Sequence, residues 1–93
     1  MTPATPRVLA EGEFHHKESF GPGTVCRGAV LLECTWDGGT FESGLFAGGV
    51  FRSGRFTGGT FYGGIFLGGT FEGGVWENGF DAQGRYRPRG EAP

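Results

Sequence analysis

Nine aromatic residues follow one another along the chain at a constant spacing of five residues. A helix keeps residues on one side with a period of about 3.6 and a strand with a period of about two, so neither gathers these rings. A chain that turns once in every five residues does gather them. The rings therefore predict a solenoid with an aromatic core. They are Trp36, Phe41, Phe46, Phe51, Phe56, Phe61, Phe66, Phe71 and Trp76.

The residues around each ring complete the repeat unit. A glycine stands two positions before every ring from Phe41 onward, and Gly, Ser or Asn stands two positions after each ring. The residue directly before the ring is often Thr, Val or Ile, which favour extended backbone. Glycine tolerates tight turns, and a small residue leaves room beside a large ring. Each unit is therefore predicted to be a short extended piece followed by a turn, with the ring inside and its two neighbours outside.

We interpret four units as one square coil of about 20 residues, with successive coils about 4.8 Å apart. The run from Cys26 to Trp76 then makes two to three coils. On this interpretation each ring stacks on the ring 20 residues further along the chain. The expected columns are Trp36–Phe56–Trp76, Phe41–Phe61, Phe46–Phe66 and Phe51–Phe71.

The pattern resembles the pentapeptide-repeat family, whose unit is a small residue, any residue, Leu or Phe, and two variable residues. The resemblance covers residues 34–78 and extends back through Ala29-Val30-Leu31. The chain departs from the family by having Gly where Ala is the commoner small residue. The resemblance implies an all-β fold, a short right-handed quadrilateral β-solenoid. It leaves the function open, because the family hosts several roles.

The repeat divides the chain into three expected parts. Residues 1–24 form an N-terminal capping segment, residues 25–80 the pentapeptide-like solenoid and residues 81–93 a basic, flexible C-terminal tail. An uncovered coil end exposes strand edges that invite association, so both ends need cover. We expect Phe14 and Phe20 to lie across the first coil, and Phe80, one position out of phase with the rings, to plug the last.

Composition and charge narrow the class of protein. The chain has 21 Gly and 10 Phe, but a disordered Gly-rich chain has no reason to keep the ring phase over nine units. A formal net charge of −2 argues against binding nucleic acid. We see no signal-peptide pattern and no apolar run of about 18 residues, so no membrane partner is expected. Cys26 and Cys34 fit neither a metal spacing nor a disulfide framework, which predicts a cytoplasmic protein.

No set of residues in the sequence supports catalysis, and no catalytic, cofactor or metal site is predicted. His15 and His16 are adjacent, so on a strand they point to opposite sides, and no third ligand has a matching spacing. Asp37 and Glu77 would share a face about 10 Å apart, as solvated charges rather than a catalytic pair. The protein is therefore not expected to be an enzyme.

The square coil gathers apolar outward side chains on one face and round one corner. Such a patch usually marks an interface. We expect a two-fold homodimer, with cover of the patch by residues 8–20 as the alternative. Leu67→Glu is predicted to weaken association without unfolding the coil. The expected interface residues are Val30, Leu32, Leu45, Ala47, Val50, Ile65 and Leu67.

The sequence thus predicts a non-enzymatic, self-assembling structural protein, as a closed dimer or an open stack. The alternative is a protein-binding module. Some pentapeptide-repeat proteins inhibit or protect a type II topoisomerase through an acidic, DNA-like surface, and that role is implied only by the resemblance. Ice or carbohydrate binding has little support, since the repeat offers one two-rung Thr ladder and one outward aromatic residue. The acids of the repeat are Asp37, Glu42, Glu72 and Glu77, set against Arg52 and Arg55.

Overall fold

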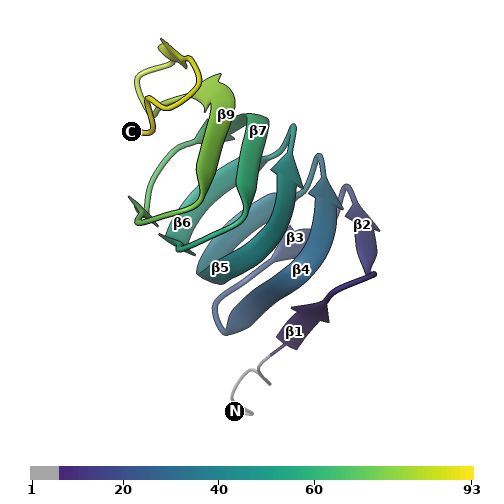
Figure 1. The fold of residues 1–93 in the computed structure, drawn as a ribbon. Helices are drawn as coiled ribbons and strands as arrows, with labels where there is room; N and C mark the ends of the chain where they lie inside the picture. The colour runs from purple at the N-terminus through teal and green to yellow at the C-terminus, as the bar shows by residue number, and fades with distance from the viewer. Residues whose placement is uncertain (1–6) are drawn as a thin grey trace.

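The chain winds into a β-solenoid of about five turns with about 15 residues in each turn (Figure 1). The structure is a computed structural model, and it describes residues 7–93. Within those residues it contains strands and turns and no helix. The all-β solenoid predicted from the spacing of the rings is confirmed.

Over residues 7–93 ten strands follow the coil, and the longer ones bend round its corners. They join into one sheet that is parallel except at its last strand. The strands are β1 (Arg7–Ala10), β2 (Phe14–His16), β3 (Ser19–Phe20), β4 (Thr24–Leu32), β5 (Thr35–Ala47), β6 (Val50–Phe56), β7 (Thr60–Phe66), β8 (Thr70–Phe71), β9 (Val75–Phe80) and β10 (Tyr86–Arg87).

The register of the sheet shows that a coil contains three units. Trp36 pairs with Phe51 and Phe41 pairs with Phe56, so partners lie 15 residues apart. The predicted square coil of about 20 residues, the two to three coils and the four columns are therefore wrong. A spacing of five fixes the length of one side, and either three or four sides bring every ring inward. The sequence period alone does not distinguish a triangle from a square.

The three-sided coil gives each ring two kinds of aromatic neighbour. Phe41 lies parallel to Phe56, one coil away, with ring centroids 4.7 Å apart. It meets Phe46, on the next side of its own coil, edge to face at 6.0 Å. Both arrangements are favoured by the quadrupoles of aromatic rings. The same two contacts recur along the coil and form a closely packed core.

We name the three sides of the coil by their inward residues. Face 1 is centred on Leu9, Cys26, Phe41, Phe56 and Phe71. Face 2 is centred on His15, Leu31, Phe46, Phe61 and Trp76. Face 3 is centred on Phe20, Trp36, Phe51 and Phe66.

The glycine two positions before each ring is required by the backbone of the coil below. A Cβ atom on Gly44 would meet the carbonyl oxygen of Ala29, and one on Gly49 would meet that of Cys34. The space beside the ring matters less: at Gly59 the nearest ring atom, Cε1 of Phe41, would lie 3.0 Å from the added carbon. The expected reason, room for a large ring, is therefore secondary to the close stacking of corner on corner.

The segment expected to cap the coil carries strands of its own. β1 and β2 pair in parallel with β4, and β3 pairs with β5, so residues 7–20 wind as the first coil. Phe20 is buried, and its ring lies 5.8 Å from that of Trp36. Phe14 instead points outward with 62% of its surface exposed. Residues 1–6 of the expected capping segment lie outside the described part of the chain.

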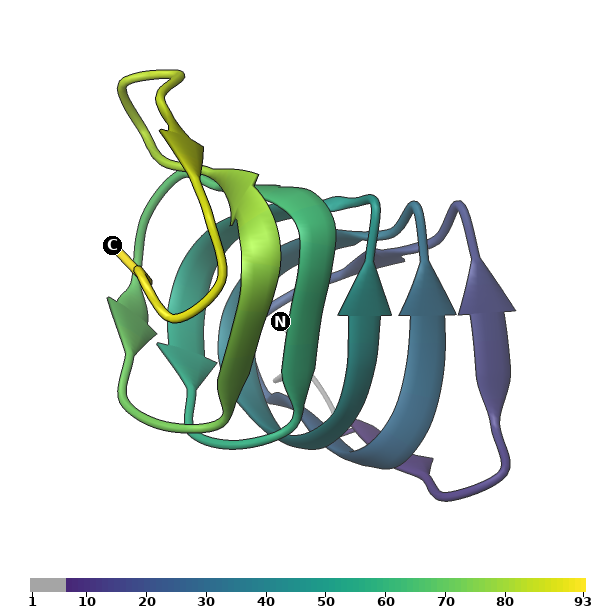
Figure 2. The same cartoon turned by 45° about the horizontal axis from the view of Figure 1, so that its top comes forward.

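The last residues run across the other end of the coil (Figure 2). β10 pairs antiparallel with β9, the backbone nitrogen of Gly90 donates to the carbonyl oxygen of Trp76, and Ala92 packs against the core. Phe80 does not plug the end, since 41% of its surface is exposed and its ring contacts that of Tyr86. The segment expected to be a flexible tail thus makes the contacts of a cap.

Candidate interaction surface

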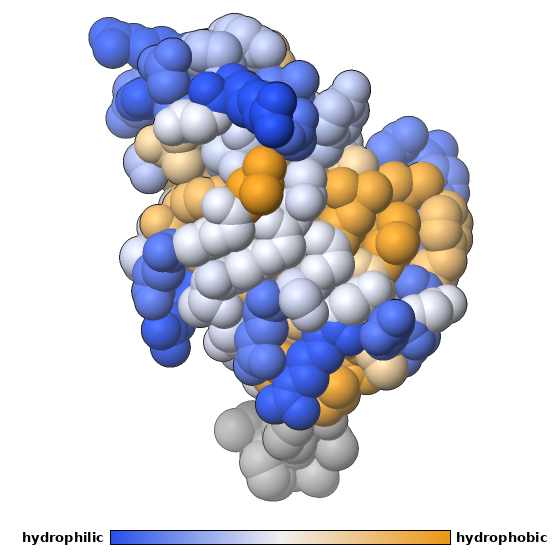
Figure 3. All heavy atoms as spheres, in the orientation of Figure 1, coloured by the Kyte–Doolittle hydropathy of each residue, from blue (hydrophilic) through white to orange (hydrophobic). Residues whose placement is uncertain are grey.

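Face 2 presents a continuous group of apolar side chains on its outer surface. Phe14, Val30 and Leu45 lie next to one another in register across β2, β4 and β5. Leu32 and Ala47 form a second pair of neighbours two residues further along β4 and β5. We call Phe14, Val30, Leu32, Leu45 and Ala47 the apolar patch. Hydrophobic side chains gather over this region in the space-filling view (Figure 3).

The structure divides the predicted interface between two faces. Val30, Leu32, Leu45 and Ala47 lie together on face 2, whereas Val50, Ile65 and Leu67 lie on face 3. The division follows from the size of the coil, because Leu45 is in register with Thr60 rather than with Ile65. Leu67→Glu therefore loses its basis as a test of the apolar patch.

Two aromatic residues of face 2 had no place in the predicted interface. Phe14 was assigned to the end of the coil, and only the register of β2 on β4 brings it beside Val30. Tyr62 lies next to Ala47, where the 15-residue coil brings it. A shallow hollow of about 340 Å³ runs along the edge of face 2. It is lined by Leu32, Glu33, Ala47, Gly48, Tyr62 and Gly63.

The acids of the repeat, in contrast, are each paired with an arginine. Arg55 binds Glu72 through two hydrogen bonds of 2.8 Å, which hold the pKa of that carboxyl below its ordinary value. The remaining pairs are Arg27–Glu42 at 3.2 Å, Arg52–Asp37 at 3.9 Å and Arg89–Glu77 at 3.3 Å. These pairs are exposed and contribute little to stability, but they leave no run of unpaired acids across the repeat.

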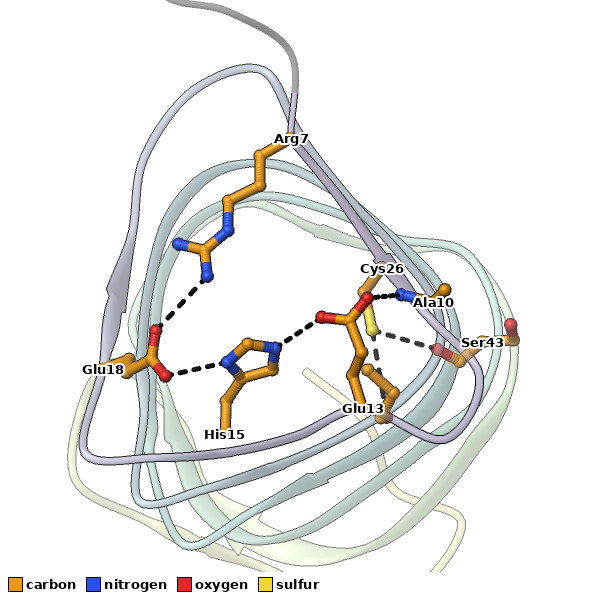
Figure 4. A network of polar contacts seen from close by, with 8 residues as sticks. Arg7, Ala10, Glu13, His15, Glu18, Cys26 and Ser43 are labelled. Atoms are coloured by element: carbon orange, nitrogen blue, oxygen red, sulfur yellow. Dashed lines mark hydrogen bonds and ion pairs between the residues drawn. The ribbon is translucent and has the colours of Figure 1, made fainter.

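The N-terminal end of the coil carries a polar network around His15 (Figure 4). His15 occupies the inward position of β2, where later coils have Leu31 and Phe46. Its Nδ1 lies 2.8 Å from Oε1 of Glu18 and its Nε2 lies 2.9 Å from Oε1 of Glu13. The hydrogen bond to Glu18 is the largest cause of a raised pKa at His15. The end of the coil is therefore lined with charge.

The C-terminal end is closed around Asp81, which takes the inward position that the next ring would have. Only 2% of its surface is exposed. Its carboxylate accepts hydrogen bonds from the backbone nitrogens of Gln83 and Arg85 and from Nε of Arg87, each at 2.9 Å. The bond from the backbone of Arg85 is the largest cause of a pKa lowered from the ordinary value. Trp76 adds a bond from Nε1 to the carbonyl oxygen of Arg87 at 2.9 Å.

The two cysteines are free thiols buried in the second coil. Burial raises the pKa of Cys26 to about 11 and also raises that of Cys34. Since the thiolate is the reactive form, neither side chain is activated as a nucleophile. His15 and His16 lie on opposite sides of β2 as expected, with 11% and 49% of their side chains exposed. Within residues 7–93, no three or more His, Cys, Asp or Glu side chains form a group suited to a metal ion.

No known protein family matches the chain, and neither a curated protein nor a solved structure shows significant similarity to it. Over residues 7–93 the structure also contains no helix long and apolar enough to cross a membrane.

Proposed function

We propose that the protein is a non-enzymatic structural component that associates with a second copy of itself through the apolar patch on face 2. One observation carries the proposal. The patch spans three neighbouring strands without a charged side chain between its members, whereas the acids of the repeat form ion pairs with arginines. A contiguous apolar surface of this kind on a small protein marks a contact site.

The outward row of face 2 suits a two-fold contact. Its members, from the first coil to the fifth, are Phe14, Val30, Leu45, Thr60 and Val75. Leu45 occupies the middle coil, so an antiparallel arrangement places it against its own copy and sets Phe14 against Val75 of the second copy. Identical surfaces then meet, as a closed dimer requires.

The size of the surface sets the strength of the dimer. Five strands about 4.8 Å apart give a row about 20 Å long, and two outward rows make a surface of roughly 300 Å² on each copy. A stable interface needs about 800 Å² from each partner. The proposed dimer is therefore weak, and it dissociates on dilution.

Two further features bear on the role and place of the protein. The acids of the repeat face arginines, so the alternative of an acidic, DNA-like surface that binds a topoisomerase has little support. Cys26 and Cys34 are free thiols, which suits a reducing compartment, and we place the protein in the cytoplasm.

Light scattering over a range of concentrations tests the proposal. The mean mass is expected to rise from one copy towards two and to level off there. Leu45→Glu should keep the protein monomeric at concentrations where the unchanged chain associates. Leu67→Glu is the matched control, since Leu67 is 45% exposed on face 3, and it should associate normally. A mass of one copy at all concentrations would contradict the proposed dimer. An equal loss of association in both variants would contradict the assignment of the contact to face 2.

A further inference from the structure

The geometry around His15 fixes its protonation state in the closed coil. Its two ring nitrogens face two different carboxylates, those of Glu18 and Glu13, at 2.8 and 2.9 Å. An ionised carboxylate only accepts hydrogen bonds, and a neutral imidazole carries one N–H. Both contacts are hydrogen bonds only when both nitrogens carry a proton, which makes the ring an imidazolium cation.

We infer that a protonated His15 holds the first coil closed, and that the first coil opens more often once His15 loses its proton. His15 belongs to β2, the short middle strand of that coil, and its two partners lie in the turns on either side of β2. The clamp thus ties together both turns of a coil that, among residues 7–93, has a neighbouring coil on one side only. Edge segments of this kind have low local stability.

The groups that surround His15 agree with a cation in this place. Glu13 and Glu18 flank it, and Nη2 of Arg7 in β1 lies 3.5 Å from the other oxygen of Glu18. From β3, the ring of Phe20 meets His15 edge to face at 5.3 Å. β4 contributes the neutral thiol of Cys26, which lies close to Glu13 in the network. The two carboxylates therefore outnumber the single arginine.

The direction of the pH effect follows from the shifts. The pKa of His15 is raised in the closed coil, chiefly by its bond to Glu18, so the closed coil holds its proton more tightly than the open one. The clamp acts fully below the ordinary histidine value of about 6.5 and is lost as the pH rises through the raised value. Glu13 and Glu18 have lowered pKa values. Their contribution to the stability of the closed coil is therefore present above the ordinary pKa of a glutamate and is lost as the pH falls.

The first coil covers a natural reporter of its opening. Leu9 lies in register with Cys26, whose side chain is fully buried beneath it. When the first coil lifts away, this thiol becomes accessible to a reagent in the solvent. The rate of its labelling, divided by the rate in the unfolded chain at the same pH, then measures the fraction of open coils and removes the effect of thiolate concentration.

Two measurements on the full chain test the inference. A histidine titration by NMR should give His15 a midpoint above about 6.5. Glu18→Gln should lower that midpoint. Labelling with a disulfide reagent, in a Cys34→Ala background so that only Cys26 reacts, should show protection that falls by up to about tenfold per pH unit as His15 deprotonates.

The control variants separate a clamp from a merely structural role. His15→Gln should leave the protection of Cys26 independent of pH over this range, whereas His16→Gln, which alters the exposed neighbour, should keep the dependence. A midpoint for His15 at or below the ordinary value would overturn the inference, and so would a protection that does not change with pH in the unchanged chain. Phe14 of the first coil belongs to the apolar patch, so both measurements are made at a concentration at which light scattering shows a single copy.

Discussion

At the scale of single residues, the coil depends on the alternation of rings and glycines. Each ring packs against one neighbour on the next side and one in the next coil, as Phe51 does with Phe56 at 5.9 Å and with Phe66 at 4.8 Å. Such contacts contribute about 0.5–1.5 kcal/mol each beyond the burial of the ring. The glycines between them let the corners stack at the distance that these ring contacts require.

Two adjacent glycines allow the demands of space and of backbone conformation to be separated. Gly48 has a φ of 74°, and an added Cβ would have only Cγ of Glu33 near it, at 3.6 Å. Gly49 has no such φ, but its Cβ would meet the carbonyl oxygen of Cys34. Gly48→Ala should lower the free energy of unfolding by about 1–2 kcal/mol, the cost of a left-handed residue.

Gly49→Ala should lower the free energy of unfolding by about 3 kcal/mol or more, because the backbone carbonyl of Cys34 cannot move aside without shifting a whole corner of the coil. Denaturant unfolding of the two variants and the unchanged chain measures both values. The explanation by corner stacking fails if Gly49→Ala proves the milder of the two.

At the scale of elements, the two ends of the coil use charge where the middle uses rings. His15 takes the inward place of face 2 in the first coil, and Asp81 takes that of face 3 in the last. Inward-pointing charges are one way in which proteins protect an exposed strand edge. The ends therefore differ in chemistry from the repeat although they continue its path.

The cap around Asp81 should matter for stability. Asp81→Ala leaves two backbone nitrogens and the guanidinium of Arg87 without their acceptor. We expect the thermal midpoint to fall by several degrees Celsius. Glu77→Gln, which removes only the charge that pairs with the exposed Arg89, should leave the midpoint nearly unchanged. Thermal unfolding followed by circular dichroism compares them, and an equal effect of both variants would refute a special role for Asp81.

The same carboxylate gives the cap a dependence on acid. The pKa of Asp81 is lowered in the folded chain, chiefly by the backbone of Arg85, so its stabilising effect is present above the ordinary value and disappears as the pH falls below it. Unfolding measured from pH 6 down to pH 2 should show a loss of stability. The loss should be smaller in Asp81→Asn, which has no carboxyl to titrate. The same loss in both chains would assign the acid effect to other groups.

At the scale of the whole molecule, charged or covered ends and an apolar side favour a closed assembly over an open stack. Another copy of the protein stacked on the N-terminal end of the coil would bury the His15 network. The C-terminal end is covered by residues 82–93. Burying such charges without new partners is unfavourable. Association through face 2 leaves both ends untouched.

Removing the cover should change the size of the assembly. A chain ending at Asp81 exposes the end of the core at Trp76 and frees the outer edge of β9. We expect this variant to form species larger than two copies, whereas the full chain stops at two. Light scattering at matched concentrations gives the answer. A mass of the full chain that keeps rising with concentration would contradict a closed assembly.

Much of the fold follows from local rules, because a ring every five residues between small, turn-forming residues points inward whatever the number of sides. The apolar residues Val30, Leu32, Leu45 and Ala47 follow from the same alternation, and the structure places them together. Phe14 was missed because the first coil is one or two residues longer than the later ones: Phe14 pairs with Val30 and Arg7 with Thr24. Because of these extra residues, the first coil does not show the five-residue period in the sequence.

The sequence by itself determined that the chain is a β-solenoid and that it turns between the rings from Trp36 to Trp76, since each of these depends on residues within a few positions of one another. Only the tertiary structure decided that three units close a coil, that Phe41 stacks on Phe56, and that His15 and Asp81 take ring positions at the ends. These features depend on contacts between residues 15 or more positions apart. The rings stack on rings of the next coil, and the corners stack on corners of the next coil. No single five-residue unit contains both partners of either contact.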